Sequence, residues 1–386
     1  MSVETITLGC RLNFAESETI RRTAPHDENW IVVNSCAVTN EAVRQTRQAI
    51  RRAHRESPLA KIIVTGCAAE LDRASFEGLP GVSQIVENAR KLSSLAANDV
   101  MAPAGFQGHV RSFVGVQSGC DHRCTFCSIW KARGPSRSLP FELIRDAVAR
   151  EIDRGAREIV LTGVDITDYD GGIGSLCQAL LASEPRLLRL RLSSLDGVEI
   201  DEPLFDLIAG EPRLLPHFHL SLQAGDDLIL KRMKRRHSRA DAVRTVERIK
   251  AVRPDATIGA DLIAGFPTET EEMAINSLKL LEDCDIIAAH IFPFSPRPDT
   301  PAQRMPQLPR EIVKQRAQRL RKAAAERRGR WLDGFIGSVQ PVLIENSGKG
   351  HADNFAPVLI DGASRGQAGL ARVTGRDSDQ LLAVFA

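Results

Sequence analysis

Three cysteines stand close together in the middle of the chain with the spacing Cys-X3-Cys-X2-Cys: Cys120, Cys124 and Cys127. This spacing suits one corner of a cubic iron-sulfur cluster. A 4Fe-4S cluster has four irons, so three thiolates leave one iron without a protein ligand. That open iron can bind the amino and carboxylate groups of S-adenosylmethionine. The run therefore predicts a cluster that binds this cofactor.

Zinc is the alternative metal for such a motif. Zinc sites usually combine one cysteine pair with a distant second pair, and the rest of the chain contains no second Cys-X2-Cys pair. The run also resembles the radical S-adenosylmethionine signature, in which an aromatic residue, here Phe126, is usual before the third cysteine. We therefore expect a 4Fe-4S cluster here, with Phe126 close to the cofactor.

Three further cysteines, Cys10, Cys36 and Cys67, each come shortly after an apolar run of strand length. Helix-like segments between these runs predict a parallel sheet, whose strands all end at one edge. Each cysteine alone reads as a small buried residue. Together they are expected to meet at that edge and hold a second cluster. The runs are Val3–Leu8, Trp30–Asn34, Lys61–Thr65 and, with no cysteine after it, Gln84–Glu87.

The segment Asn98–Gly108 loses periodicity and is typical of a linker. After it, six apolar runs alternate with helix-like segments, which predicts an incomplete (β/α)6 barrel that is open on one side. Chemistry in such barrels lies at the carboxyl ends of the strands, and the central cysteine motif follows the first run. The runs are Ser112–Ser118, Arg157–Gly163, Leu188–Ser194, His217–Leu222, Thr257–Ile263 and Ile287–Phe294.

Small and polar residues at the same strand ends are candidate contacts for S-adenosylmethionine. Gln223 and Asp261 are expected to bind its amine or ribose. Gly163, Asp165 and Ser194 are the further candidates at this rim. No side chain beyond the cluster ligands is expected to act as a catalytic group.

The end of the chain contains short apolar runs separated by glycine-rich turns such as Ser347–Gly350. Short strands with frequent turns predict a small β-barrel. The expected fold is therefore α/β, with a parallel α/β domain at 1–100, a partial barrel at 110–330 and a β domain at 335–386. The terminal runs are Ser338–Ile344, Phe355–Ile360, Gly369–Val373 and Leu381–Phe385.

Basic side chains gather in two runs, Lys231–Arg239 and Arg310–Arg330, although the net charge is only +2. Phosphate contacts from such runs would give salt-sensitive affinity for RNA. The alternative is an ordinary solvated helix face. The β-barrel beside the second run favours RNA.

The chain has no apolar run long enough to span a membrane and no secretory signal at its start. We therefore expect a cytoplasmic protein without membrane contact, whose cysteines are thiols or cluster ligands and not disulfides. Cys177 and Cys284 lie in helix-like segments and are expected to be packing residues. Gly171–Gly174 lacks the context of a dinucleotide-binding motif and is expected to be a flexible loop.

Taken together, these features resemble the methylthiotransferases, a radical S-adenosylmethionine family with an N-terminal three-cysteine domain, a partial barrel and a C-terminal TRAM domain. The resemblance covers nearly the whole chain. It is closest to the bacterial branch that acts on threonylcarbamoyladenosine in tRNA. The phrases that carry it are Leu8–Asn13, Asn34–Thr39, Thr65–Cys67, Gln117–His122, Leu220–Gly225 and Gly350–Phe355.

The resemblance implies two 4Fe-4S clusters and the addition of a methylthio group to carbon 2 of threonylcarbamoyladenosine at tRNA position 37. An aromatic carbon-hydrogen bond has no leaving group and resists polar substitution, so its replacement requires radical chemistry. The central cysteines would hold the cluster that cleaves S-adenosylmethionine, and the N-terminal cysteines the cluster that carries the sulfur. The implied partners of the monomer are the tRNA anticodon stem-loop, an electron donor such as a flavodoxin or ferredoxin, and a sulfur source.

The chain departs from the family pattern at three places. The segment between Cys10 and Cys36 is short, Trp130 stands where proline is common, and Asp299 stands where glycine is common. Alternative functions are a sister enzyme for isopentenyladenosine-37 or for a ribosomal protein, a radical S-adenosylmethionine enzyme unrelated to tRNA, and a non-catalytic iron-sulfur protein that binds RNA.

Overall fold

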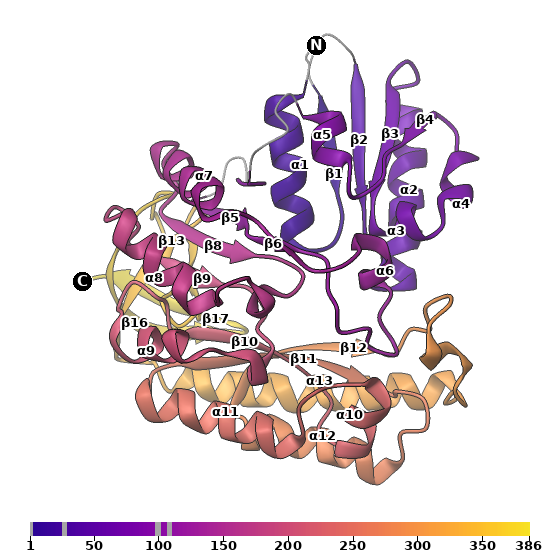
Figure 1. Ribbon diagram of the computed structural model, residues 1–386. Coiled ribbons are helices and arrows are strands. Elements are labelled where there is room, and N and C mark those ends of the chain that lie inside the picture. The colour runs from indigo at the N-terminus through magenta and orange to yellow at the C-terminus, as the bar shows by residue number, and fades with distance from the viewer. Residues whose placement is uncertain (1–2, 25–28, 97–101, 106–109) are drawn as a thin grey trace.

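The computed structural model describes residues 3–24, 29–96, 102–105 and 110–386. Figure 1 shows an N-terminal α/β lobe, a central group of parallel strands with helices outside it, and a small C-terminal barrel. The expected α/β fold is thus confirmed. None of the helices in the described ranges is both long and apolar enough to cross a membrane.

The N-terminal lobe is a four-stranded parallel sheet in the order β1-β2-β3-β4. Both faces are covered, which explains why β2 and β3 read as almost continuous apolar runs. α1 and α5 cover one face, and α2, α3 and α4 cover the other. The elements are β1 (Glu4–Thr7), α1 (Arg11–Thr23), β2 (Trp30–Ser35), α2 (Asn40–Glu56), β3 (Lys61–Gly66), α3 (Cys67–Leu71), α4 (Arg73–Glu77), β4 (Val82–Ile85) and α5 (Lys91–Leu95).

The central part has the six predicted strands in two three-stranded parallel sheets, β5-β8-β9 and β10-β11-β12. Parallel bridges from Leu190 to Leu214 and from Leu195 to Leu220 join the sheets into one partial barrel. The strands are β5 (Arg111–Gly115), β8 (Glu158–Thr162), β9 (Leu190–Leu192), β10 (His217–Gln223), β11 (Thr257–Ala264) and β12 (Ile286–Pro293).

Helices surround the partial barrel and bury one large apolar core against its strands. Two short strands and a short helix carry the chain around the central cysteines. These short elements are β6 (Gln117–Ser118), α6 (Ile129–Arg133) and β7 (Arg137–Ser138). The outer helices are α7 (Phe141–Asp153), α8 (Ile173–Ser183), α9 (Glu202–Gly210), α10 (Asp227–Met233), α11 (Arg239–Val252), α12 (Glu271–Asp283) and α13 (Arg310–Asp333), with 3-10 turns at Ile166–Asp168, Gly197–Glu199 and Pro301–Arg304.

The N-terminal lobe covers the open side of the partial barrel. The edge strands β5 and β12 do not pair with each other, and α1 packs against β5, where Ala15 contacts the core around Phe113. At the other edge, Arg297 after β12 donates to the side-chain oxygen of Asn40 at 2.8 Å. The backbone N–H of Asn40 donates to Ser295 at 3.4 Å. The lobe therefore bridges both edges and encloses the barrel interior.

Two local expectations are corrected. Ile173 and Gly174 do not lie in a flexible loop: they begin α8, and the N–H of Gly174 donates to the Asp201 carboxylate at 3.1 Å. Of the expected linker, Asn98–Met101 and Phe106–Gly108 lie outside the described residues. Between them, Pro103 accepts a 2.8 Å hydrogen bond from the N–H of Gly115, so this stretch is anchored to β5.

The C-terminal part is a closed barrel in the order β13-β14-β15-β17-β16. Its apolar side chains form a separate core. The expected turn at Ser347–Gly350 is shorter than predicted, because Lys349 and Gly350 already belong to β14. The strands are β13 (Val339–Ile344), β14 (Lys349–Ala352), β15 (Pro357–Leu359), β16 (Ala368–Asp377) and β17 (Gln380–Phe385).

The loop after β14 closes the bottom of the partial barrel, at the amino ends of its strands. Phe355, with φ of +70°, stacks between His217 and His351 at centroid distances of 4.9 and 4.4 Å. The guanidinium groups of Arg191 and Arg111 lie 4.7 and 5.2 Å from the centre of the same ring. The small barrel is thus docked through a half-buried aromatic side chain surrounded by cationic and histidine side chains.

Glu158 holds this junction together. Its carboxylate accepts from Arg191 at 2.8 Å and from Arg189 at 3.1 Å, and the side chains of Glu158 and Arg191 are both 2% exposed. Arg189 also pairs with Asp353 in the docking loop. Replacing Glu158 with glutamine leaves these arginines without their shared charge partner, so we expect the free energy of unfolding in urea to fall by about 3–5 kcal/mol.

The matched control is Asp153→Asn, because Asp153 pairs with Arg186 in an exposed ion pair; its loss is expected to cost less than about 1 kcal/mol. Burial tends to raise the pKa of Glu158, but Arg191 and Arg189 outweigh it and hold the pKa at about 2, below the ordinary 4.5. Its stabilisation is therefore complete above pH 4.5 and is lost as the pH falls toward 2. If the wild type and Glu158→Gln lost stability equally over this range, the junction would not depend on this charge.

Candidate functional site

The first part of the site is the barrel trio, defined as Cys120, Cys124 and Cys127. Its loop follows β6 and is fixed by close backbone contacts. A Cβ on Gly119, whose φ is +86°, would lie 1.9 Å from the carbonyl oxygen of Pro135, so the turn requires glycine. Thr125 donates through its hydroxyl to the carbonyl of Arg232 at 2.7 Å and through its N–H to that of Met233 at 3.1 Å. The loop is therefore held against α10.

The donor set of the barrel trio fits a soft metal cluster. Burial raises the pKa of the Cys120 thiol to about 12 and that of Cys127 to about 11, and the neighbouring cysteines add to both shifts. Sulfur ligands bind iron as thiolates, so metal binding here would release protons from these thiols. The positive charge of the metal would offset the burial and mutual repulsion of the thiolates. The backbone N–H of Ile129 already donates to Sγ of Cys127 at 3.4 Å.

Arg235 supplies positive charge beside the trio. Its Nη1 lies 3.8 Å from Sγ of Cys124, while Nη2 donates to Asp196 at 2.7 Å and to the carbonyl of Ser221 at 2.9 Å. The side chains of Arg235 and Asp196 are only 6% and 4% exposed. Within the cysteine motif, Nε2 of His122 lies 3.1 Å from the Asp165 carboxylate. These polar contacts fix the orientation of the loop that carries the barrel trio.

The second part is the N-terminal trio, defined as Cys10, Cys36 and Cys67. Each follows a parallel strand as predicted: Cys10 precedes α1, Cys36 follows β2, and Cys67 begins α3. A Cβ on Gly9 would lie 2.6 Å from Sγ of Cys36, so this thiol packs against the backbone next to Cys10. Burial raises the pKa of Cys36 to about 11, and the thiols of Cys10 and Cys67 contribute to the rise. Three mutually interacting thiols are the ligand chemistry that an iron-sulfur cluster requires.

The two trios lie next to each other. α3, which begins at Cys67, packs against α6, which follows Cys127, and Ala132 of α6 belongs to the same apolar core as Cys67. The charge of Cys67 contributes to the raised pKa of Cys127 across this contact. The arrangement therefore brings two three-thiol sites from different lobes to one place.

A buried ionic network fixes this contact between the lobes. Arg133 donates to Glu16 at 2.9 and 3.0 Å and to Asn13 at 2.6 Å. Lys91 forms a second ion pair with Glu16 and donates to Asn88 at 2.9 Å. The side chains of Arg133, Glu16 and Lys91 are at most 6% exposed. α1, α5 and α6 are thereby held in a fixed relation.

A cavity containing about 660 Å³ of non-protein space, part of it open to solvent, lies at the carboxyl ends of β10, β11 and β12. It brings together three of the predicted cofactor contacts, namely Phe126, Gln223 and Asp261. Val38 and Thr39, which follow Cys36, form its wall on the side of the N-terminal lobe. A cavity that is mostly apolar with few polar groups is suited to a small ligand.

The other predicted contacts lie elsewhere on the rim. Gly163 packs against the backbone of Gln117: a Cβ on Gly163 would lie 2.8 Å from the carbonyl oxygen of Gln117. The N–H of Asp165 is bound by the side-chain oxygen of Gln117 at 2.9 Å, and its carboxylate accepts from Thr167 at 2.8 Å. Ser194 is half-buried after β9. These three residues do not line the cavity described above.

Next to the cavity lies the interior cluster, defined as Arg11, Arg191, His217, His219, Asp261 and His290, of which His290 is exposed. Asp261 accepts from His219 at 3.0 Å and from His290 at 3.2 Å. Although burial opposes it, these two histidines hold the pKa of Asp261 well below its ordinary value. Burial holds the pKa of His217 well below its ordinary value, and Arg191, His219 and Arg11 add to the effect. Asp261 links this cluster to the cavity.

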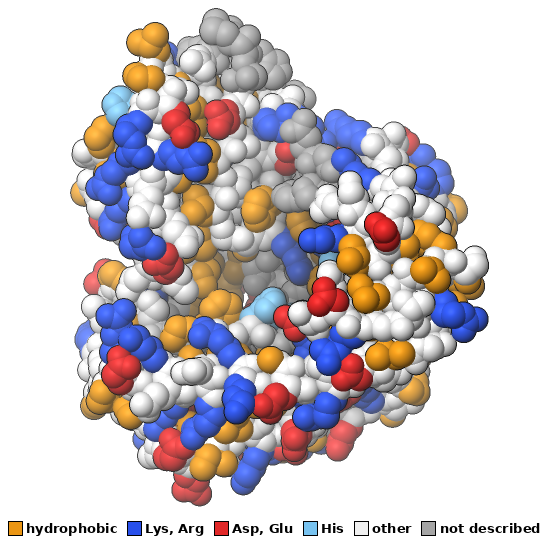
Figure 2. All heavy atoms as spheres, turned by 180° about the vertical axis from the view of Figure 1, so that it is seen from behind, with side chains coloured by type: hydrophobic (Ala, Val, Ile, Leu, Met, Phe, Trp, Pro, Cys, Tyr) orange, Lys and Arg blue, Asp and Glu red, His pale blue; other side chains and the backbone are white. Residues whose placement is uncertain are grey.

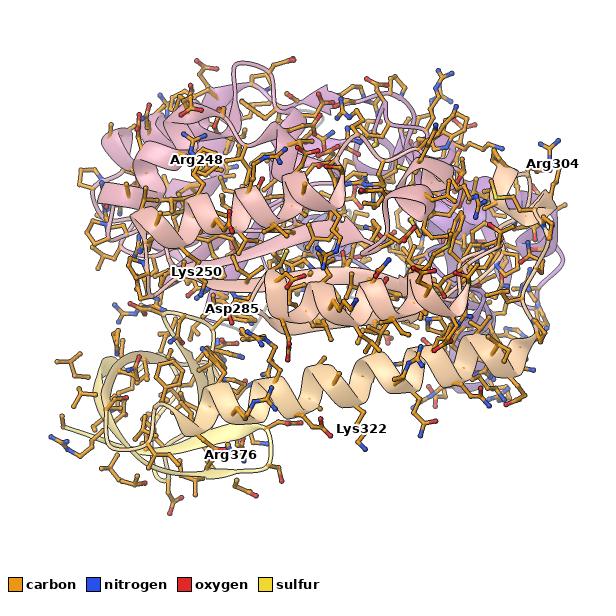
Figure 3. The ribbon with its side chains drawn as sticks, turned by 90° about the horizontal axis from the view of Figure 1, so that it is seen from below. Arg248, Lys250, Asp285, Arg304, Lys322 and Arg376 are labelled. Carbon is orange, nitrogen blue, oxygen red and sulfur yellow. The ribbon has the colours of Figure 1, made fainter. Side chains whose placement is uncertain are left out.

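Several cations of the two basic runs form contacts within the chain, while others, such as Lys322, are exposed. Figure 3 shows α13 lying along the underside of the molecule, with Lys322 pointing away from it. On this helix Arg316 is buried against Glu269 at 2.8 Å, and Arg327 pairs with Asp285. The first run contains Arg235, which lies beside the barrel trio. The sequence alone does not distinguish such paired cations from free ones.

Two departures from the family pattern have a local explanation. Asp299 has a φ of +58°, the region that favours glycine, and its N–H donates to Gln303 at 3.0 Å. Trp130 lies between Arg123 and Lys131, whose charged groups are 5.3 and 5.4 Å from its ring centre. The short segment between Cys10 and Cys36 contains α1 and β2, and part of it, 25–28, lies outside the described residues.

Cys177 and Cys284 are fully buried in the barrel core, as expected for packing residues. Sequence reasoning missed Glu16, Arg133, Lys91 and the two histidines around Asp261. Each is a single polar residue whose partner is distant in the chain. For His219 and His290 a signal existed, because both fall on predicted strands at positions that alternate with apolar residues.

Residues 114–281 match the Radical SAM superfamily, and residues 2–87 match an uncharacterized protein family, UPF0004. Over 383 residues, 93% of this chain and 91% of its relative, the chain is 43% identical to the threonylcarbamoyladenosine tRNA methylthiotransferase MtaB of Rickettsia prowazekii. It is 29% identical over 388 residues to the tRNA-2-methylthio-N(6)-dimethylallyladenosine synthase of Erythrobacter litoralis, covering 89% of this chain and 86% of that protein.

The fold is similar to that of the radical S-adenosylmethionine methyltransferase TsrM from Kitasatospora setae, solved with cobalamin and a [4Fe-4S] cluster bound. The TM-score is 0.54 at 13% identity, over 75% of this chain and 68% of that chain. At this identity the similarity concerns the fold alone.

Proposed function

The chain belongs to the threonylcarbamoyladenosine tRNA methylthiotransferases, and from this we propose that it converts threonylcarbamoyladenosine at tRNA position 37 to its 2-methylthio derivative. It is a radical S-adenosylmethionine enzyme that uses 4Fe-4S clusters and acts on tRNA. The observation that carries the proposal is the meeting of two three-cysteine sites beside one cavity, in a chain that is 43% identical to an enzyme of this activity.

We propose that the barrel trio and the N-terminal trio each hold a 4Fe-4S cluster with one iron free of protein ligands. When bound, the first cluster supplies the electron that cleaves S-adenosylmethionine, and the second supplies the sulfur. The protein positions and encloses these groups. Arg235 places positive charge beside the barrel trio, and the Glu16 network fixes the lobe that carries the N-terminal trio.

Phe126, Gln223 and Asp261 are the proposed contacts for S-adenosylmethionine in the cavity. Gly163, Asp165 and Ser194 would act from the neighbouring part of the rim, Asp165 by orienting His122 within the cysteine motif. Asp165 contacts Gln117, Thr167 and His122 within the rim, so its role would be to position the loop. No side chain in this scheme needs to be a nucleophile.

The proposed domains are 1–100, 110–330 and 335–386, each with its own apolar core. We further propose that the protein works as a cytoplasmic monomer, presents the cavity to the anticodon stem-loop, and receives electrons from a flavodoxin or ferredoxin. The sulfur would come from a separate source. Reconstitution with each donor, followed by product analysis, tests these partners.

Nucleoside mass spectrometry of tRNA from a deletion strain tests the proposed function. We expect 2-methylthio-threonylcarbamoyladenosine to disappear and threonylcarbamoyladenosine to accumulate, with recovery on complementation. Loss of a methylthio derivative of isopentenyladenosine instead would assign the chain to the sister activity. An unchanged nucleoside profile together with a changed ribosomal protein would also contradict the proposal.

A further inference from the structure

Arg11 differs from the other arginines around the barrel interior. Arg191 and Arg189 donate to Glu158 at 2.8 and 3.1 Å, and Arg111 pairs with Glu345 at 3.0 Å. Within the described residues, Arg11 has neither an ion pair nor a hydrogen bond from its side chain. Its guanidinium lies 5.9 Å from the ring centre of Phe113 on β5. A half-buried guanidinium therefore keeps its N–H donors available.

None of the charged groups around Arg11 forms an ion pair with its guanidinium within the described residues. Arg111 and Arg191 act on it as like charges, and Asp261 and Glu158 as opposite ones. Glu158 is already shared by two arginines, and Asp261 is engaged by His219 and His290 at 3.0 and 3.2 Å. The unpaired guanidinium of Arg11 would therefore stabilise a bound anion. A guanidinium binds a carboxylate through two parallel hydrogen bonds.

Arg11 lies beside the N-terminal trio. Arg11 follows Cys10 directly and is the first residue of α1. Among the charges that act on Arg11 is that of Asp261, which lines the cavity at the carboxyl ends of the strands. Figure 2 shows, from behind, a hollow between the lobes with basic and histidine side chains around it. Arg11 therefore lies next to Cys10 of the N-terminal trio and interacts electrostatically with a residue that lines the cavity.

We propose that Arg11 binds the carboxylate of the threonylcarbamoyl group of the substrate nucleoside and thereby selects it over nucleosides with a neutral N6 substituent. This inference rests on the proposed function and identifies the group that the site recognises. An isopentenyl substituent has no charge and would leave the guanidinium unpaired in the enclosed space. Discrimination is strong in such cases because a site built for a charged group penalises an analogue without it.

The test measures binding of anticodon stem-loops to the anaerobically reconstituted holoenzyme. Three RNAs of the same sequence carry threonylcarbamoyladenosine, its methyl ester, or unmodified adenosine at position 37. We expect the wild type to prefer the free acid by about tenfold to a hundredfold over the other two, as for hydrogen bonds to a charged group. Arg11→Met should abolish this preference without changing the affinity for unmodified RNA, and Arg11→Lys should restore part of it.

Arg248→Met is the matched control, because Arg248 pairs with Glu202 on the outer surface, away from the cavity. It should keep the preference for the free acid. Iron content of Arg11→Met is measured alongside, since Arg11 adjoins Cys10; a variant with the wild-type iron content provides the valid comparison. If a variant loses iron, Arg11→Lys with full iron serves in its place.

Equal weakening of all three RNAs by Arg11→Met would mean that Arg11 contacts an RNA phosphate and would overturn the inference. An undiminished preference for the free acid would overturn it as well. Failure of the proposed function is distinguishable, because the wild type itself would then form no methylthio product from the threonylcarbamoyl RNA. In that case the deletion strain also keeps its 2-methylthio-threonylcarbamoyladenosine.

Discussion

A variant with alanine at Cys120, Cys124 and Cys127 is expected to form no 5'-deoxyadenosine above the enzyme-free background. These thiols are the proposed ligands of the cluster that donates the electron to S-adenosylmethionine, and no other cysteine within the described residues lies in their loop. Without them the cofactor has neither its electron donor nor the open iron that binds it. The measurement is chromatography of the products after reduction with dithionite under anaerobic conditions.

Cys177→Ala and Cys284→Ala are the matched controls. Both cysteines are fully buried in the barrel core, so their replacement removes a thiol without removing a proposed ligand. We expect cleavage of S-adenosylmethionine to continue in both variants. Cleavage at the wild-type rate by the barrel-trio variant would refute the assignment of this site.

A variant with alanine at Cys10, Cys36 and Cys67 is expected to separate cleavage from transfer. The barrel trio remains, so 5'-deoxyadenosine should still form when the reductant is present. The methylthio nucleoside should be absent, because the proposed sulfur-carrying cluster has lost its protein ligands. Both products are measured in the same reaction with tRNA that contains threonylcarbamoyladenosine.

Burial, and then the thiols of Cys10 and Cys67, raise the pKa of Cys36, and Sγ of Cys36 packs against the backbone at Gly9, next to Cys10. Replacing all three cysteines together therefore tests one proposed cluster site and not three separate positions. Formation of the methylthio nucleoside by this variant would mean that sulfur reaches the substrate without the N-terminal trio.

The sequence predicts where the six cysteines lie relative to the strands, because spacing and strand position are local signals. Cys120, Cys124 and Cys127 stand within one short loop, and Cys10, Cys36 and Cys67 follow runs that form β1, β2 and β3. The rule that parallel strands end at one edge of a sheet then brings the second set together. The alternating pattern likewise predicted the six barrel strands.

Other features depend on partners that are far apart in the chain. Arg235 belongs to a basic run that favoured RNA contact, but it is buried beside Asp196 and Cys124. Phe355 reads as the start of a strand, yet its positive φ and its stacking on His217 dock the small barrel. Such roles follow from the packing of whole lobes, which periodicity does not reveal.

Iron analysis of oxygen-protected protein tests most directly whether two clusters share this chain. We expect about eight irons per chain in the wild type and about four in either trio variant, since each cubic cluster contains four. Mössbauer spectra should identify the remaining iron as one 4Fe-4S cluster in each variant. A wild type with only about four irons, or an N-terminal-trio variant that retains all of its iron, would contradict the two-cluster arrangement.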